Sequence, residues 1–247
     1  MGELSQIIKL DATGSTNLYL KDLLQSSSLR DYTAVVAKSQ VKGRGQMGAS
    51  WQSESGKNLT VSVLKKLDAM PIIHQFNLNI GVSLALFDVL RRLNIPDLKV
   101  KWPNDIMSGG NKICGILIEN ILKGQQIQSS IIGIGLNVNQ VSFENLEKVA
   151  SLKSLTGRFF DLEELLTDLL ERLRFYLDDI ETKTVRQLIP SYEKLLFRKD
   201  KPSTFTDKQN IMFMGFIRGV SNEGRLVVEL EDKIFKEFNL KEVSLLY

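Results

Sequence analysis

Hydrophobic and polar positions alternate with a period of two in several short stretches of this chain, a pattern that predicts β-strands. Strands are expected at residues 33–37, 58–64, 98–101, 113–121 and 127–138. In the last of them, isoleucine, leucine and valine share one face, whereas glycine and asparagine share the other. We expect the apolar face to pack on a helix and the small, polar face to border a ligand; a close strand–helix crossing is the alternative.

Other segments have the 3.6-residue period of helices. A short helix is expected from the capping-rich run 13–17 to about residue 24, and a long one over residues 72–93, where the apolar stripe is wide enough for burial. Leucines at helical spacing follow Asp161 and end with Ile180, and a further helix is expected up to about residue 196.

Short strands and turns replace helices after the charged stretch 198–202. We therefore expect two domains. Residues 1–198 are predicted to form an α+β domain, a mixed β-sheet with helices packed on it, and residues 199–247 a small, partly open β-barrel or sheet that needs its neighbour for stability.

The amino-acid composition excludes several classes of protein and of catalytic site. The 247 residues are 43% hydrophobic and 25% charged, which is typical of a globular protein. One cysteine and one histidine exclude an internal disulfide and a Cys/His zinc cage, and they exclude histidine-based nucleophilic catalysis unless His74 is the base. We expect Cys114 to be a core residue and His74 an ordinary helix-surface or packing residue.

The sequence favours neither a membrane nor a nucleic acid as partner. No segment resembles a signal peptide, and none reaches the ~18 apolar residues of a membrane span, so we expect a cytoplasmic protein. A net charge of +3 without a basic, aromatic stripe argues against DNA binding. A monomer or a homodimer is expected, because a free sheet edge is able to pair two copies.

A glycine-rich loop at residues 40–48 is the first candidate for chemistry. Its three glycines let backbone amides approach an anion, and Lys42 and Arg44 add positive charge. The spacing matches neither a Walker loop nor a dinucleotide fingerprint, and a flexible hairpin loop is the alternative. We expect the loop to be mobile without a ligand.

The second candidate is the run Lys101-Trp102-Pro103-Asn104-Asp105 together with Lys112. A carboxylate at the end of a strand and an ammonium across a glycine turn can orient a phosphate or a metal; a surface ion pair is the alternative. Strict alternation puts Lys112 on the strand face opposite Gly115. For both residues to touch one ligand, the strand must bend or begin after Lys112.

In this order along the chain, the motifs resemble those of biotin protein ligases. The resemblance lies in Ser15-Thr16-Asn17, in the loop 42–48 with Trp51, in 101–105 followed by 112–119, and in 133–139. It implies the class II synthetase-like fold of biotin and lipoate ligases with an SH3-like C-terminal domain. It also implies that biotin and ATP, with Mg²⁺, form biotinyl-5'-AMP, and that a lysine of a biotin carboxyl carrier protein then accepts the biotinyl group.

The resemblance also implies roles for individual residues. Lys112, Arg44 and Asp105 are the expected catalytic residues, with Lys112 on the carboxylate and α-phosphate oxygens and Asp105 positioning Lys112 or the metal. The residues expected to bind biotin are Ser15, Thr16, Asn17, Gln40, Gly43, Arg44, Gly45, Lys112, Gly115, Leu117, Gly133 and Gly135. Those expected to bind ATP are Arg44, Gln46, Trp51, Asn104, Lys112 and Asn137, with Asn104 and Trp51 at adenine and Asn137 on the phosphate side. No metal ligands are indicated.

Two departures from the family pattern bear on these expectations. Gln46 stands where the family loop often has a second arginine, which puts clamping of the phosphate in doubt. The ligase pattern begins close to Met1, so we expect no N-terminal helix-turn-helix domain and no repressor function. A lipoate or octanoate ligase is the nearest alternative, and a non-catalytic ligand sensor or nucleic-acid-binding module is a more distant one.

Overall fold

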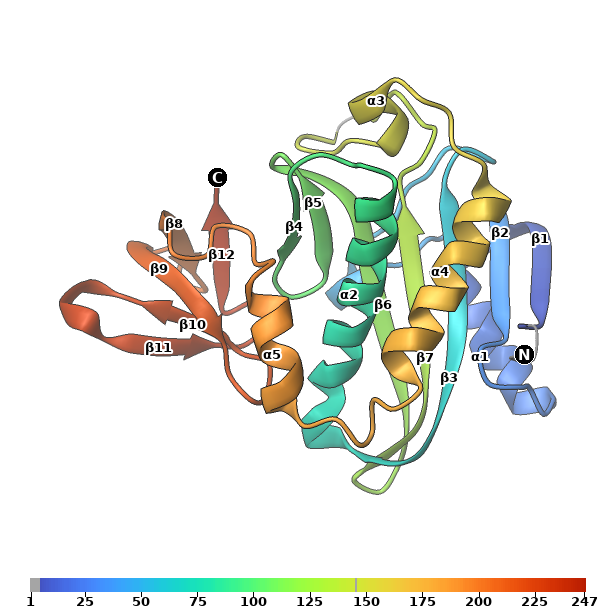
Figure 1. Ribbon diagram of the computed structural model, residues 1–247, viewed down its shortest axis with the longest axis horizontal. Coiled ribbons are helices and arrows are strands. Elements are labelled where there is room, and N and C mark those ends of the chain that lie inside the picture. Colours follow the sequence, from blue (N-terminus) through green and yellow to red (C-terminus); the bar gives the residue numbers. More distant parts are fainter. Residues whose placement is uncertain (1–4, 145) are drawn as a thin grey trace.

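The alternating segments pair into a central seven-stranded sheet in the order β1-β2-β3-β7-β6-β5-β4 (Figure 1). The computed structural model describes residues 5–144 and 146–247. β1 pairs with β2 in parallel and the remaining neighbours pair antiparallel, so the predicted mixed sheet is confirmed. The strands are β1 (Ile7–Thr13), β2 (Ala34–Gln40), β3 (Leu59–Pro71), β4 (Leu98–Lys101), β5 (Asp105–Ser108), β6 (Asn111–Lys123) and β7 (Gln126–Leu136).

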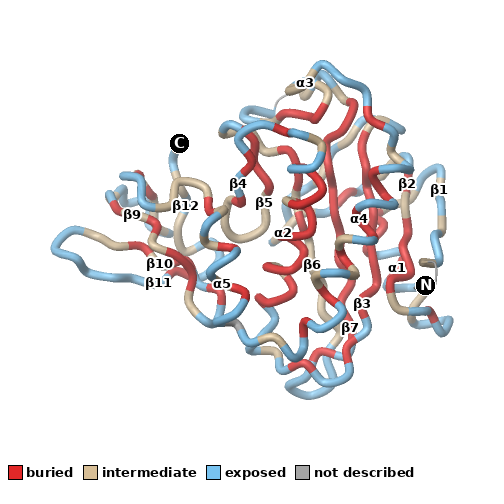
Figure 2. The backbone as a smooth tube through the Cα atoms, viewed as in Figure 1, coloured by how far each residue is buried: buried red, intermediate tan, exposed pale blue. Residues whose placement is uncertain are grey.

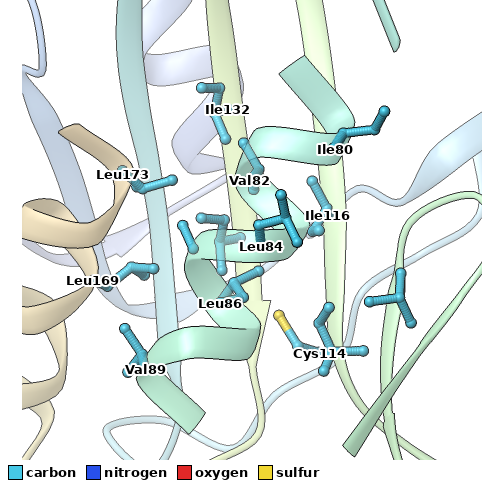
Figure 3. Packing of buried hydrophobic residues seen from close by; sticks show 14 of the residues in the cluster. Ile80, Val82, Leu84, Leu86, Val89, Cys114, Ile116, Ile132, Leu169 and Leu173 are labelled. Carbon is cyan, nitrogen blue, oxygen red and sulfur yellow. The ribbon is translucent and has the colours of Figure 1, made fainter. Parts of the chain in front are cut away.

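Helices cover both faces of this sheet. α2 (Gln75–Arg92) and α4 (Leu162–Leu177) pack on one face, and α1 (Thr16–Ser26) packs on the other against β2, β3 and β7. The apolar side of β7 faces α2, as its alternation predicts, and Figure 3 shows Ile132 beside Val82 of this helix. α4 begins where expected, because the Asp161 carboxylate accepts hydrogen bonds from the backbone N–H groups of Glu163 and Glu164.

The long apolar helix lies within the core. By length and composition alone, the segment Ile72–Arg92 passes as a membrane span, with a mean hydropathy of 1.2. In the structure α2 packs on the sheet beside α4, and Figure 2 shows it buried over much of its length. Core helices of globular proteins pass the same test, so this is weak evidence for a membrane.

The C-terminal segment forms a second, antiparallel sheet in the order β11-β10-β9-β8-β12. Its strands are β8 (Pro202–Asp207), β9 (Met212–Val220), β10 (Leu226–Glu229), β11 (Phe235–Phe238) and β12 (Val243–Leu246). Buried side chains of this sheet, Phe205 among them, join the same hydrophobic core as the first sheet. The neighbouring helix α5 (Val185–Glu193) contacts β9, and the Glu193 carboxylate accepts a hydrogen bond from Val220 N at 2.9 Å.

The structure corrects some details of the prediction. Edge strand β1, strand β5 and the short helix α3 (Leu152–Thr156) were not expected. Asp105 begins β5 instead of ending the strand before it. The pairing of β5 with β6 also shifts register, because Ile106 pairs with Cys114 whereas Met107 pairs with Lys112, so Ile113 is an extra residue.

Candidate active site

The N-terminus of α1 brings buried polar side chains onto one face of the sheet. Ser15, Thr16 and Asn17 are each at most 4% exposed. The Thr16 N–H and hydroxyl donate to Gln40 Oε1 at 2.8 and 3.1 Å. The Ser62 hydroxyl lies 2.7 Å from Thr16 Oγ1 and 2.5 Å from Asn17 Oδ1. Within the described residues the Ser15 hydroxyl makes no capping hydrogen bond, so it remains for a ligand.

The floor below these side chains consists of glycines on β6 and β7. A Cβ on Gly133 would lie 3.0 Å from Asn17 Cγ, and one on Gly135 would lie 2.6 Å from Trp51 Cζ2. A Cβ on Gly115 would lie 3.1 Å from the same indole. Side chains and ligands thus approach the sheet backbone closely at these three positions, as the small face of the strands predicts.

The glycine-rich loop folds back over this floor as a hairpin. Trp51 N donates to Gly43 O at 2.9 Å, and a bridge joins Arg44 to Ser50. Gly43 is required here, because a Cβ would overlap the Trp51 carbonyl oxygen. The Arg44 guanidinium forms an ion pair with Glu119 at 3.2 Å, and Glu119 also accepts a hydrogen bond from Asn17 at 2.8 Å. The loop is therefore tied to the polar cluster at α1.

Lys112 and Asp105 form an ion pair on this face, with 2.7 Å between Nζ and Oδ1. Strict alternation would place Lys112 and Gly115 on opposite faces of β6. The extra residue Ile113 turns Lys112 to the same side as Gly115. A Cβ on Gly115 would lie 3.3 Å from Lys112 Nζ. The Lys112 ammonium also lies 5.7 Å from the centroid of the Trp51 ring.

These elements enclose a cavity of about 180 Å³, called cavity I here. It gathers segments that lie more than 100 residues apart in the sequence, from Ser15 to Gly135. The predicted residues that line it are Ser15, Thr16, Asn17, Gln40, Arg44, Gly45, Gln46, Trp51, Asn104, Asp105, Lys112, Gly115, Leu117, Gly133 and Gly135.

An adjoining cavity of about 150 Å³, cavity II, is lined by Ser50, Trp51, Gln52, Lys112, Asn137, Phe143, Leu146 and Val149. Two buried polar atoms at its wall, Asn137 Oδ1 and Trp51 Nε1, have no hydrogen-bond partner among the described residues. A buried acceptor and a buried donor left unpaired are costly, so they indicate a place for a polar ligand. Ser50, Trp51 and Lys112 line both cavities.

The structure places two predicted residues outside cavity I. Gly43 shapes the base of the loop, and Asn137 lines cavity II with its Nδ2 donating to Ala150 O at 3.2 Å. Asn104 lines cavity I, where its amide donates to Ile116 O at 2.7 Å. Sequence reasoning missed Ser62 and Glu119. Ser62 lies on the same strand face as the cavity, and Glu119 is two residues beyond Leu117, so period two was the available signal for both.

Neither a cysteine nor a protein-only metal site contributes to these cavities. Cys114 is buried on the opposite face, and burial raises the pKa of its thiol, so it remains protonated in the core. Among the described residues no group of three or more His, Cys, Asp and Glu side chains lies at metal-binding distance.

Comparison with known proteins assigns the family. The model of the biotin/lipoate A/B protein ligase family matches residues 10–137, just over half of the chain. The chain belongs to the biotin/lipoate A/B protein ligase family. The matched span includes every strand that lines cavity I and all of its predicted residues.

Individual members of this ligase family resemble the chain over about two thirds to nearly all of its length. It is 31% identical to the bifunctional ligase/repressor BirA of Salmonella typhimurium over 240 residues, which cover 96% of this chain and 73% of that protein. It is 30% identical over 164 residues to the biotin–[acetyl-CoA-carboxylase] ligase of Mycobacterium tuberculosis, covering 65% of this chain and 60% of that protein. A solved biotin protein ligase from Aquifex aeolicus, in complex with biotin and ATP, superposes with a TM-score of 0.81 at 26% identity and covers 98% of this chain and 99% of its own.

Proposed function

We propose that this ligase activates biotin with ATP to give biotinyl-5'-AMP and pyrophosphate, and then transfers the biotinyl group to a lysine of a biotin carboxyl carrier protein. The observation that carries the proposal is the position of Lys112. Its side chain lines both cavity I and cavity II, and both cavities hold unused polar groups. At this junction, a carboxylate in one cavity and an α-phosphate in the other would meet beside the Lys112 ammonium.

The polar end of cavity I favours biotin over lipoate. A ureido ring carries two N–H donors and one carbonyl acceptor, whereas the dithiolane ring of lipoate has no comparable groups. The end of the cavity near α1 offers the Ser15 hydroxyl, the Thr16–Gln40 pair and the Asn17 amide. A dithiolane at this place would offer the Ser15 hydroxyl no hydrogen bond, and a site lined by hydrogen-bonding groups discriminates against a ligand without them.

Cavity II suits adenine. The unpaired Asn137 Oδ1 matches the exocyclic amino group, and the unpaired Trp51 Nε1 matches a ring nitrogen, while Phe143, Leu146 and Val149 supply apolar walls. We therefore assign adenine to Asn137, whereas the resemblance implied Asn104 at adenine and Asn137 on the phosphate side. The Asn104 amide is already engaged by Ile116 O, which makes it a support of the floor.

The charges around the junction support in-line attack on the α-phosphate. The biotin carboxylate oxygen forms a bond to phosphorus while the bond to the pyrophosphate oxygen breaks, and Lys112 Nζ offsets the negative charge that gathers on the phosphoryl oxygens. Asp105, 2.7 Å from Lys112 Nζ, holds the ammonium in place. Arg44 adds a second positive charge from the glycine-rich loop. In the absence of ligand its guanidinium is paired with Glu119.

The second step joins biotin to the acceptor. The neutral amine of the acceptor lysine attacks the acyl carbon, AMP leaves with the bonding electrons of the acyl–oxygen bond, and the amine gives up a proton. Mg²⁺ remains part of the proposal: Asp105 is the carboxylate nearest the junction, so phosphates and water would supply most of its ligands. When bound, the ion would offset charge on the pyrophosphate leaving group.

Pyrophosphate exchange tests this proposal directly. Radiolabelled pyrophosphate is mixed with the protein and ATP, with biotin, lipoate or neither added. Label entering ATP only when biotin is present supports the proposal, whereas exchange with lipoate alone assigns the chain to the other branch of its family. A protein that exchanges with neither acid, yet binds both biotin and ATP, would be a non-catalytic sensor.

A further inference from the structure

The tip of the glycine-rich loop is contacted by the C-terminal sheet. Lys241 Nζ donates a hydrogen bond to the carbonyl oxygen of Met47 at 3.0 Å, across 194 residues of sequence. Met47 adopts the left-handed conformation, with φ 54°, and the residue is 62% exposed. The side chain of Met47 therefore does little to fix the tip, whereas its carbonyl oxygen is held from the other domain.

Lys241 is presented by a well-braced turn between β11 and β12. Glu242 N donates to Asn239 O at 3.1 Å, and Asn239 N donates to the Glu242 carboxylate at 2.7 Å. The second bond lowers the pKa of the Glu242 carboxyl, so the brace remains ionised at neutral pH. Lys241 itself adopts the left-handed backbone conformation, with φ 61°.

The same turn and loop tip border a cavity of about 260 Å³ between the two domains, lined by Gln46, Met47, Asp105, Lys241 and Val243 among others. Gln46 and Asp105 also line cavity I, so this contact lies one side chain away from the proposed reaction centre. The base of the loop is fixed by its own backbone bonds, from Trp51 N to Gly43 O and from Gly45 N to Ala49 O. The contact with Lys241 adds a second anchor at the tip.

We propose that Lys241 is a positioning residue, which latches the tip of the glycine-rich loop to the C-terminal domain and so keeps the wall of cavity I closed over the activated intermediate. This inference rests on the proposed function, because it needs an intermediate to retain. It assigns the C-terminal domain a direct part in retention of the adenylate. Lys241 would act through Met47, without touching substrate.

The test is the Lys241→Met variant, which keeps most of the apolar stem but removes the donor and the charge. Lys241→Arg and Lys241→Gln each retain a donor, and Lys241→Gln removes the charge. The matched control is Lys233→Met. Lys233 is also an exposed lysine of this sheet with positive φ, 58°, but it lies in the β10–β11 connection, which projects away from the first domain (Figure 1).

Three measurements are made on the full chain: amide hydrogen exchange of residues 43–50, release of biotinyl-5'-AMP into the filtrate without acceptor, and the thermal midpoint. We expect Lys241→Met to speed exchange at the loop tip and release of the adenylate by roughly two- to tenfold, the range that loss of one hydrogen bond gives. We expect Lys241→Arg to restore both, Lys241→Gln to restore them at least in part, and Lys233→Met to resemble the wild type.

The outcomes separate the inference from the proposed function. Wild-type loop exchange and wild-type release in an active, folded Lys241→Met protein would overturn the latch and leave the ligase activity intact. Effects that persist in Lys241→Arg would also overturn the proposed contact, because that contact needs only a hydrogen-bond donor at position 241. Absence of biotin-dependent pyrophosphate exchange in the wild type would instead contradict the proposed function, while loop exchange would still report whether Lys241 holds the tip.

Discussion

Replacement of Lys112 by methionine removes the charge at the junction of the two cavities with little change in volume. At about 4 Å and an effective dielectric constant of about 20, two unit charges interact by about 4 kcal/mol. The Lys112 side chain is 32% exposed, so solvent screens part of this energy. We expect adenylation to slow by about 10²- to 10³-fold, which corresponds to about 3–4 kcal/mol of lost transition-state stabilisation.

The same substitution also affects folding, because Asp105 loses its partner. The Asp105 side chain is 18% exposed and Oδ1 has no hydrogen bond within the described residues apart from the ion pair. Removal of one partner from a partly buried pair costs about 1–3 kcal/mol. Lys112→Met is therefore expected to lower the free energy of unfolding, and the double variant with Asp105→Asn is expected to regain part of this stability without regaining activity.

Biotin-dependent pyrophosphate exchange and single-turnover formation of biotinyl-5'-AMP measure the rate, and urea unfolding measures the stability. Lys123→Met is the matched control, because Lys123 is the exposed last residue of the same strand, β6. Adenylation by a folded Lys112→Met protein within about threefold of the wild type would refute the role given to the ammonium, since no electrostatic contribution of the size calculated above would remain.

Three further substitutions test the remaining parts of the site. Gly135→Val places carbon where the Trp51 indole lies, so we expect altered tryptophan fluorescence and weaker biotin binding; unchanged values would contradict the close approach. Asn137→Ala is expected to raise the KM for ATP about tenfold with the KM for biotin unchanged, and the reverse pattern would exclude adenine from cavity II. Gln46→Arg adds a cation to the wall of cavity I and should slow release of the adenylate into the filtrate; faster release would contradict this.

The elements with strong periodicity could be predicted from the sequence. The leucines after Asp161 indicated α4, and the alternation at 132–138 indicated both the apolar and the glycine face of β7. β1 escaped prediction because it is an edge strand whose positions are mostly exposed, with Lys9 and Asp11 among them. β5 escaped because it has only four residues and directly follows a proline-containing turn.

Most of the residues that line cavity I were singled out from the sequence, but their geometry was not. The extra residue Ile113 arises from pairing between β5 and β6, a non-local event that leaves no mark on the composition of either strand. The second cavity depends on Phe143, Leu146 and Val149, which belong to no recognisable motif. Asn137 and Asn104 could therefore not be assigned to different cavities before the strands were placed in space.

A crystal structure of the full chain with a non-hydrolysable analogue of biotinyl-5'-AMP tests most directly whether biotin and nucleotide meet at Lys112. The bicyclic ring should lie beside Thr16 and Gln40, the adenine beside Asn137, and the acyl–phosphoryl linkage within hydrogen-bond distance of Lys112 Nζ. Density for the linkage far from Lys112, or for the two ends in positions outside these cavities, would contradict the proposed reaction centre.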